Sequence, residues 1–266
     1  MMDNMIVIDN LNFSYDDKVI FNKFNLSIMN GSFTTIIGSN GSGKSTLANI
    51  LTGLISSDNI YIDGILLCSD NLSYIRQNLG IVLGCLSHSF ICESVFDELS
   101  YSLTGSNDEI KKRVNFISSS LGIDFLLDRN PMELSVGEGQ LVGIACALID
   151  EPDLIILDEA FSNIDYVSKL KILKYLKKIN NENGVTILNF TSDIDDSLYG
   201  SDIVVIDKGR VILQGDNDSV YKQEKILKKV GFNLPFMVDL SKKLSYYDLI
   251  DGFIYDMDEM IDVLWK

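Results

Sequence analysis

Apolar residues in the first 37 positions fall into short runs separated by Asn, Asp and Gly. The runs at residues 5–8, 24–28 and 33–37 are rich in β-branched and aromatic side chains, and we expect them to form strands. A glycine-rich segment follows the third run, and apolar residues then recur at helical spacing from Leu47 to Leu54. The predicted order is therefore strand, glycine loop, helix.

The middle of the chain has the periodicity of helices rather than strands. Apolar residues recur at intervals of three and four over residues 93–103 and 108–121, where Asn107 is the expected N-cap, and a third helix is expected over 137–149. We therefore expect a helical subdomain at about residues 87–150.

The remaining chain returns to alternating strands and helices. We expect strands at residues 154–157, 185–188, 203–206 and 211–213, with a Lys-rich helix that runs through Ile179. Strands that alternate with helices favour a parallel sheet in an α/β fold. From about Gly231 the tail is acidic, yet its apolar residues recur at helical spacing, as in an amphipathic helix that covers a core or a dimer partner.

The charge of the chain limits its partners. Its 266 residues carry 38 acidic and 22 basic side chains, a net charge of −16. Such a chain repels phosphodiester backbones and anionic lipid, so we expect no nucleic acid partner. The longest apolar runs are far shorter than the roughly 20 residues that cross a bilayer, so we expect no direct membrane insertion. The N-terminus lacks the pattern of a signal peptide.

Cysteine and histidine give no sign of a metal site. Cys68, Cys85, Cys92 and Cys146 lack the spacing of metal ligands, and we expect them to be small buried thiols in a reducing cytosol. His88 is the only histidine, and we expect it to be a surface or packing residue.

The strongest chemical signal is the segment GSNGSGKS at residues 38–45. It fits the pattern G-x-x-x-x-G-K-[ST] of a P-loop, in which backbone amides wrap a polyphosphate that glycine allows to come close. Lys44 would reach the β- and γ-phosphates, and the Ser45 hydroxyl would bind Mg²⁺. The alternative is a glycine-rich turn without a ligand. The predicted ATP-binding residues of this loop are Gly38, Asn40, Gly41, Ser42, Gly43, Lys44, Ser45 and Thr46.

A second signal is the sequence LIILDE at residues 154–159. Four apolar residues predict a buried strand, and the acid pair follows at its carboxyl end, where open α/β sheets bind ligands. Asp158 would hold Mg²⁺, and Glu159 would activate the attacking water. Alone, the same stretch could be a strand that ends in a solvated turn.

In this order the motifs resemble a known family. The P-loop, LSVGE at 134–138, LIILDE at 154–159 and SNID at 162–165 resemble the nucleotide-binding domain of ATP-binding cassette (ABC) transporters. The sequences FSY at 13–15, IRQNLGIV at 75–82 and VGFNLPF at 230–236 are most similar to the ATPase subunits of energy-coupling factor (ECF) transporters.

The resemblance implies a P-loop NTPase fold of the α/β class. An antiparallel β subdomain and a helical subdomain would belong to an ATPase domain over residues 1–225. Residues 226–266 would form a small C-terminal helical extension with dimer contacts.

The resemblance also implies roles for single residues. Two such domains pair, and each ATP lies between them. Tyr15 would stack on adenine, although a strand aromatic packed in the core is the alternative. Ser135 and Gly137 would present a hydroxyl and an amide to the γ-phosphate of the ATP held by the partner, and Asp165 would lie at the dimer seam. Glu159 and Lys44 would be the catalytic residues.

The chain departs from the family pattern at four places. Val136 and Glu138 change the signature sequence, and Leu141 replaces the arginine that usually follows it. Gly84 stands where the family has a glutamine that contacts Mg²⁺, and Ser192 stands where it has a histidine that contacts the γ-phosphate. We therefore expect nucleotide binding to survive better than turnover, as in the weaker site of a heterodimeric pair.

By resemblance, the chain is an ATPase subunit that energises import of a vitamin or a trace metal ion. Its partners would be a second ATPase subunit that is a different chain, a transmembrane coupling subunit and a substrate-binding membrane subunit. Its place would be cytoplasmic, on the inner face of the cell membrane. The alternatives are an inactive nucleotide-binding regulatory or scaffold subunit, and a soluble non-transport ABC ATPase.

Overall fold

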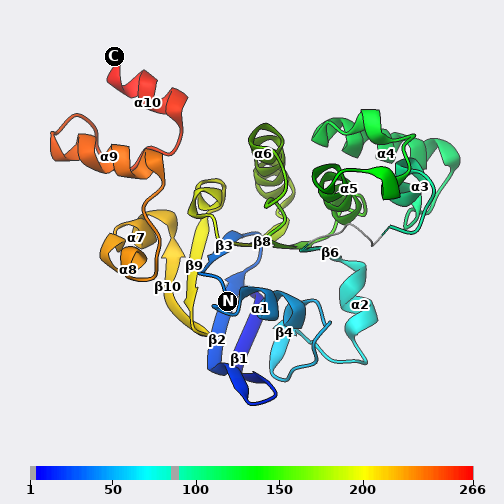
Figure 1. Ribbon diagram of the computed structural model, residues 1–266, viewed down its shortest axis with the longest axis horizontal. Helices are drawn as coiled ribbons and strands as arrows, with labels where there is room; N and C mark the ends of the chain where they lie inside the picture. Colours follow the sequence, from blue (N-terminus) through cyan, green and yellow to red (C-terminus); the bar gives the residue numbers. More distant parts are fainter. Residues whose placement is uncertain (1–3, 85–89, 266) are drawn as a thin grey trace.

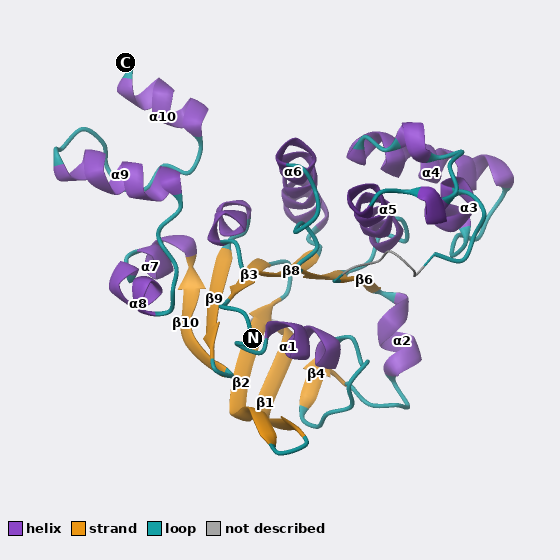
Figure 2. Cartoon of the chain, in the orientation of Figure 1, coloured by secondary structure: helices purple, strands orange, loops and turns teal. Residues whose placement is uncertain are grey.

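The computed structural model describes residues 4–84 and 90–265, and its strands form two sheets (Figures 1 and 2). The smaller sheet is antiparallel, has four strands in the order β2-β1-β4-β5 and includes the first two of the three expected N-terminal strands. Its strands are β1 (Asn4–Tyr15), β2 (Lys18–Met29), β4 (Ile60–Ile62) and β5 (Ile65–Leu66).

Strands β1 and β2 are much longer than their apolar runs predicted. Polar residues within them do not end the strands but form bulges, where Asn10 and Lys23 take positive φ angles of 53° and 52°. Side chains of the opposite strand satisfy the backbone there, since Asn25 accepts from the Asn10 amide and Asn12 accepts from the Lys23 amide. The asparagines that suggested turns are therefore parts of the sheet.

The larger sheet has six strands in the order β10-β9-β3-β8-β7-β6. All neighbours run parallel except β9 and β10, which confirms the expected parallel sheet. Its strands are β3 (Phe33–Ile37), β6 (Leu79–Leu83), β7 (Leu154–Asp158), β8 (Thr186–Thr191), β9 (Asp202–Asp207) and β10 (Arg210–Asp216).

Helices cover both faces of this sheet. Helix α1 (Lys44–Leu51) packs with β1 and β2 on one face, where Leu47 and Ile50 are fully buried. Helices α5 and α6 pack on the other face, as Figure 1 shows. The helices of this part of the chain are α2 (Leu72–Gln77), α3 (Val95–Ser100), α4 (Asn107–Leu121), α5 (Val136–Leu148) and α6 (Tyr166–Asn183), with the 3₁₀ helices η1 (Asp124–Leu126), η2 (Pro131–Glu133) and η3 (Ile194–Tyr199).

The prediction that Asn107 caps the second of the middle helices is wrong. Asn107 is the first helical residue of α4, and Ser106 is the N-cap. The Ser106 hydroxyl accepts from the Glu109 amide, while the Glu109 carboxylate accepts from the Ser106 amide at 2.8 Å. In this capping box, Ser106 and Glu109 each accept a hydrogen bond from the backbone amide of the other, and both amides would otherwise lack a partner. Asn107, one position later, cannot form this pair of bonds.

The tail does not continue as one helix. Helices α7 (Asn217–Tyr221) and α8 (Glu224–Lys229) precede it, and it contains α9 (Phe236–Tyr246) and α10 (Met257–Leu264). The chain between α9 and α10 turns at Asp248 and Gly252, whose φ angles of 57° and 75° interrupt a helix. A small core of Met237, Ile250 and Met260 holds the two helices together.

Three cysteines are free thiols, as expected, but they are half-buried rather than buried. They are Cys68, Cys92 and Cys146. The expectations for Cys85 and His88 fall outside the described residues. Among the residues that the structure describes, no helix has both the length and the apolarity to cross a bilayer.

Candidate functional site

The glycine loop lies between β3 and α1, at the carboxyl edge of the parallel sheet. Gly38 is buried, and a Cβ there would come within 2.5 Å of both the Ser42 hydroxyl and the carbonyl of Ile206. Gly43 has a φ of 111°, which favours glycine. The loop is thus a compact turn in which glycine avoids side-chain clashes, the form that phosphate binding requires.

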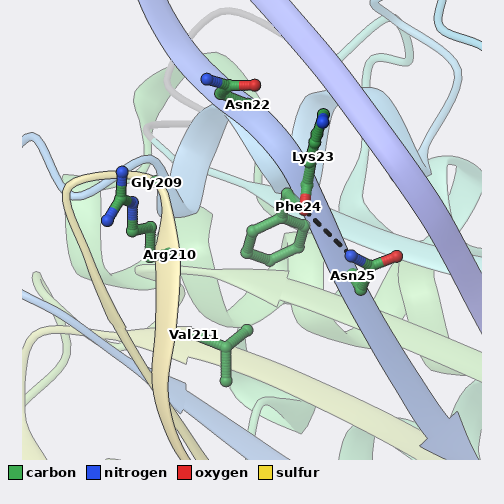
Figure 3. Close-up of a pocket in the computed structure, with 7 residues that line it drawn as sticks. All are labelled: Asn22, Lys23, Phe24, Asn25, Gly209, Arg210 and Val211. Atoms are coloured by element: carbon green, nitrogen blue, oxygen red, sulfur yellow. Dashed lines mark hydrogen bonds between the residues drawn. The ribbon is translucent and has the colours of Figure 1, made fainter.

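A neighbouring turn supports this loop from behind. The amide of Gly209, in the turn between β9 and β10, donates to the carbonyl of Ser42 at 2.9 Å. The same turn forms one wall of a hollow that faces β2 (Figure 3). The hollow is lined by Asn22, Lys23, Phe24, Asn25, Gly209, Arg210 and Val211. None of these residues belongs to the P-loop, so the hollow is separate from the candidate site.

Lys44 is the first residue of α1 and is almost completely buried, with 5% of its side chain exposed. Its Nζ donates to the Gly38 carbonyl at 2.7 Å and lies 3.5 Å from Oε1 of Glu159. The ammonium is therefore held inside the loop, where a polyphosphate would meet it at close range. A buried cation has a strong electrostatic effect because water screens it poorly.

Asp158 ends the fully buried strand β7 and is itself 5% exposed. Its Oδ1 has no hydrogen-bond partner among the described residues. Burial raises the pKa of this carboxyl, and the neighbouring Ser45 hydroxyl acts in the opposite direction. A buried, unpaired carboxylate oxygen beside a hydroxyl fits a Mg²⁺ site, because this hard cation takes oxygen ligands and completes its shell with phosphate and water.

Glu159 follows with a positive φ of 48°, at the turn directly after the strand. Its amide donates to the Phe190 carbonyl at 2.9 Å, so β8 fixes the turn. The carboxylate lies between two donors: Oε1 is near Lys44, and Oε2 accepts from the Ser192 hydroxyl at 3.3 Å. A half-exposed carboxylate held in this way can accept a proton from a water molecule.

The two replaced positions lie next to this acid pair. The Gly84 amide donates to the Asp158 carbonyl at 3.0 Å, and a Cβ at Gly84 would meet none of the described residues within 4 Å. Its φ of 49° lies in the left-handed region that favours glycine, so this position carries no side chain beside the acid pair. Ser192, by contrast, does contact the site, through Glu159. The comparison with the family pattern identified both positions, but it could not show the contact between Ser192 and Glu159.

Tyr15 lies at the end of β1 and is 45% exposed. Its ring meets Phe13 edge to face with 4.9 Å between centroids. The alternative of a core aromatic is therefore wrong, since nearly half of the side chain faces solvent. An exposed ring supported from one side is suited to stacking on a flat heterocycle.

The signature segment forms the start of α5 and is internally bonded. Ser135 is the N-cap of α5, and its hydroxyl lies 2.7 Å from Oε2 of Glu138 in a capping box. Oε1 of Glu138 is 3.0 Å from Nη1 of Arg129. The backbone and hydroxyl of Ser135 lower the pKa of Glu138. The additional carboxylate in the signature therefore carries a paired charge.

Gly137 lies close to the segment just before Asp165. A Cβ at Gly137 would come within 2.7 Å of the Asn163 carbonyl, so glycine is required where α5 passes the segment before α6. Asp165 is the N-cap of α6 and accepts from the Ser168 amide at 3.0 Å. Among the described residues, the hydrogen bonds of Ser135 and Asp165 are local and do not reach the P-loop.

Sequence reasoning missed Lys169. This residue of α6 forms ion pairs with Asp193 and Asp196, at 2.7 and 2.5 Å, just after Ser192. The signal was available in the cluster of three aspartates at 193, 195 and 196 directly after a strand. Metal-like clusters of three or more His, Cys, Asp or Glu are absent from residues 4–84 and 90–265.

The P-loop, the acid pair at the end of β7 and the two sheets define a P-loop ATPase of the ABC nucleotide-binding type. The family model described as "ABC transporter" matches residues 21–162. The chain is 33% identical to the energy-coupling factor transporter ATP-binding proteins EcfA1 of Mycoplasma mobile and EcfA of Pediococcus pentosaceus. These matches cover 98% and 97% of this chain, and 97% and 95% of the relatives. The chain belongs to the ABC transporter family, among the energy-coupling factor ATP-binding proteins.

Solved structures agree with this assignment. CbiO1 of Clostridium perfringens, part of the ABC transporter complex cbiONQ, matches with a TM-score of 0.73 and 32% identity, over 90% of this chain and 99% of that chain. The ATP-binding cassette MJ0796, in a dimeric post-hydrolysis state with ADP and Pi, matches with a TM-score of 0.71 and 28% identity, over 80% and 98%. The ABC nucleotide-binding fold and the ATPase class are thereby confirmed.

Proposed function

We propose that this chain is the ATP-binding and ATP-hydrolysing subunit of an energy-coupling factor importer, which energises uptake of a vitamin or a trace metal ion. The observation that carries the proposal is the meeting of Lys44, Asp158 and Glu159 at the carboxyl edge of the parallel sheet. The full-length similarity to relatives named for energy-coupling factor transporters supports the importer rather than a soluble ABC ATPase.

The residues of the site divide the chemistry between them. The amides of Gly38, Asn40, Gly41, Ser42, Gly43 and Thr46 bind the phosphates of ATP, which supplies the phosphoanhydride bond that is cleaved. Lys44 neutralises charge on the transferred phosphoryl group, while Ser45 and Asp158 hold Mg²⁺. Glu159 orients a water molecule and accepts its proton. Tyr15 stacks on the adenine ring.

A second ATPase subunit completes the site. Ser135 and Gly137 serve the nucleotide of that partner, and Asp165 lies at the seam between the two chains. Residues 1–225 form the ATPase domain, with a helical subdomain at about 87–150, and residues 226–266 supply dimer contacts. The exposure of Trp265, which is 82%, and of Ile261 in α10 supports a contact surface in the extension.

We further propose that the partner is a different chain and that this chain holds the weaker site. Gly84 offers no side chain toward Mg²⁺, and Ser192 replaces an imidazole with a hydroxyl that already contacts Glu159. Loss of one positioned polar contact typically lowers turnover by about 10²–10³-fold. A catalytically inactive regulatory subunit is the second candidate, which these same two residues favour.

The membrane partners are a transmembrane coupling subunit and a substrate-binding membrane subunit. The chain docks on them from the cytoplasm, at the inner face of the cell membrane. Its net charge of −16 favours docking on basic protein segments over bare anionic lipid.

The test is ATP turnover by the assembled transporter in proteoliposomes with Mg²⁺, after the change Glu159→Gln in this chain alone. We expect a partial loss, smaller than the loss from the same change in the partner. Glu182→Gln, at an exposed position of α6, is the matched control and should leave turnover intact. An equal collapse from either subunit contradicts asymmetry. An absence of measurable Mg²⁺-ATP affinity contradicts the whole proposal.

A further inference from the structure

Lys169 lies one turn into α6 and points at the segment that follows β8. Its Nζ is 2.7 Å from Oδ2 of Asp193 and 2.5 Å from Oδ1 of Asp196, and only 15% of its side chain is exposed. Most ion pairs of the described residues involve a more exposed lysine or arginine, such as the Lys178–Glu182 pair on the same helix. Lys169 and Asp196 are thus largely desolvated, while Asp193 is half exposed.

Asp196 is the most deeply buried member, with 1% of its side chain exposed. Burial raises the pKa of its carboxyl, and the hydrogen bond and charge of Lys169 act against this effect. Thr191 donates a hydrogen bond to Oδ2 of Asp196 at 2.8 Å. Because a buried carboxylate without a cation is strongly unfavourable, removal of Lys169 would force this segment to rearrange.

Members of the same cluster lie on both sides of Ser192, which is itself exposed. The Thr191 hydroxyl that donates to Asp196 also accepts from the Asp193 amide at 3.0 Å, so the backbone on both sides of Ser192 is bonded. Asp193 Oδ1 in turn accepts from the Asp195 amide at 3.0 Å. Ser192 is the only residue of the segment that reaches Glu159, at 3.3 Å, among the described contacts.

We propose that Lys169 is a positioning residue for ATP hydrolysis, because it holds residues 191–196 in the conformation that places Ser192 against Glu159. The inference rests on the proposed role of Glu159. Lys169 is also bonded by its backbone amide to the carbonyl of Asp165, at 2.9 Å. The residue expected at the dimer seam and the segment that contacts the catalytic carboxylate are therefore joined through one helical turn.

A role limited to anchoring α6 is the competing explanation. An anchor would affect the free energy of unfolding but would have no special effect on the segment around Ser192 or on the chemical step. The affinity for nucleotide is a further way to test the positioning role. In the described contacts Lys169 touches neither the P-loop nor Asp158, so it should not affect binding. Positioning should therefore lower kcat while the Kd for Mg²⁺-ATP stays unchanged.

The first experiment needs no nucleotide. Hydrogen exchange of residues 191–196 is measured by mass spectrometry in wild type, Lys169→Met, Lys169→Arg and the control Lys178→Met. We expect exchange to be at least about fivefold faster in Lys169→Met and near wild type in the other two variants. Unchanged exchange in Lys169→Met overturns the proposal, whatever the outcome for catalysis.

The second experiment measures turnover and Mg²⁺-ATP affinity in the assembled transporter. Lys169→Met should lower kcat by about fivefold with an unchanged Kd, because it acts through the single hydrogen bond from Ser192 to Glu159. Lys169→Arg should recover most of the rate. An equal rate in Lys169→Met and wild type, or a failure of arginine to rescue, overturns the proposal. If the wild-type complex binds ATP without turnover, the proposed hydrolysis at Glu159 fails, and the exchange data still decide whether Lys169 holds the segment.

Asp193→Asn provides a second variant in case Lys169→Met does not fold. Half of the Asp193 side chain is exposed, and asparagine can keep the Oδ1 acceptor for the Asp195 amide while it removes the charge that Lys169 meets. The change should also speed exchange over residues 191–196 and lower kcat. Wild-type values for both measurements contradict the proposal.

Discussion

The hydroxyl of Ser192 donates a hydrogen bond to the carboxylate of Glu159, with 3.3 Å between Oγ and Oε2. The contact joins the end of β8 to the turn after β7 and holds one oxygen of the candidate base, while Lys44 lies 3.5 Å from the other. Ser192 replaces the histidine of the family pattern, yet it still helps to orient Glu159. Its contribution can be measured directly.

Ser192→Ala should lower kcat for ATP hydrolysis by about fivefold and leave the Kd for ATP unchanged. The change removes one hydrogen bond to a partly exposed carboxylate, which is worth about 1 kcal/mol. Ser69→Ala is the matched control, since its hydroxyl also donates to an exposed carboxylate, that of Asp70, at 3.3 Å. Equal effects of the two changes on steady-state turnover would show that the Glu159 contact has no catalytic value.

Gly38→Ala should abolish nucleotide binding and lower the free energy of unfolding by about 2 kcal/mol, because the added methyl overlaps the Ser42 hydroxyl and the Ile206 carbonyl. Gly215→Ala in β10 is the control, because its Cβ would lie at an ordinary 3.6 Å from Ser219. Chemical denaturation and fluorescent nucleotide titration give the two quantities. Normal ATP affinity in Gly38→Ala would exclude the tight loop as the phosphate site.

Glu224→Gln should weaken the ion pairs that connect α8 to α9, and the resulting loss of stability should depend on pH. Hydrogen bonds from Lys228 and Lys242 lower the pKa of Glu224 to about 2, from 4.5. A lowered pKa in the folded state means that the carboxylate stabilises the fold fully above about pH 4.5 and loses this effect as the pH falls toward 2.

We therefore expect Glu224→Gln to lower the free energy of unfolding by about 1 kcal/mol at pH 7, and by progressively less as the pH falls below 4.5. Urea denaturation at several pH values measures this difference. Glu182→Gln removes an exposed carboxylate 3.9 Å from its lysine and should change the free energy of unfolding little at any pH. A Glu224→Gln effect that is constant with pH would contradict the assignment.

Ile261→Asp should weaken pairing with the second ATPase subunit without affecting the fold of the single chain. Ile261 is 48% exposed on α10, so the change removes little buried surface within the chain but adds a charge to the expected contact. Sedimentation with the partner and thermal unfolding of the chain alone measure the two effects. Met260→Asp, at a position buried in the small C-terminal core, should instead unfold the extension. Unaltered pairing in Ile261→Asp would exclude this face of α10.

The sequence predicted the elements whose chemistry is local. The P-loop, the strand before Asp158 and the helices of the middle region follow from the spacing of their residues, because each depends on residues close together in the chain. The long hairpin of β1 and β2 could not be predicted in this way. Its polar residues are satisfied by the opposite strand, as with Asn12 and the amide of Lys23, and such pairing over a distance leaves no periodic signal.

In the candidate site, too, residues in local motifs could be predicted and residues with distant partners could not. The motif identified Lys44, Asp158 and Glu159, and the structure places them together as expected. Lys169 escaped notice because its partners lie more than twenty positions away, and a lysine on a Lys-rich helix resembles a solvated surface residue. Its burial could be recognised only once α6 was seen against the end of β8.

The ion pair between Arg129 and Glu138 couples the signature segment to a residue that lies outside it. The Glu138 carboxylate caps its helix and also neutralises Arg129. Glutamine, which the family signature has at this position, would keep the cap but leave Arg129 without its carboxylate. Homologues that carry glutamine at the second position are expected to have lost the arginine at the first. A reversal of Glu138 alone should therefore be disfavoured.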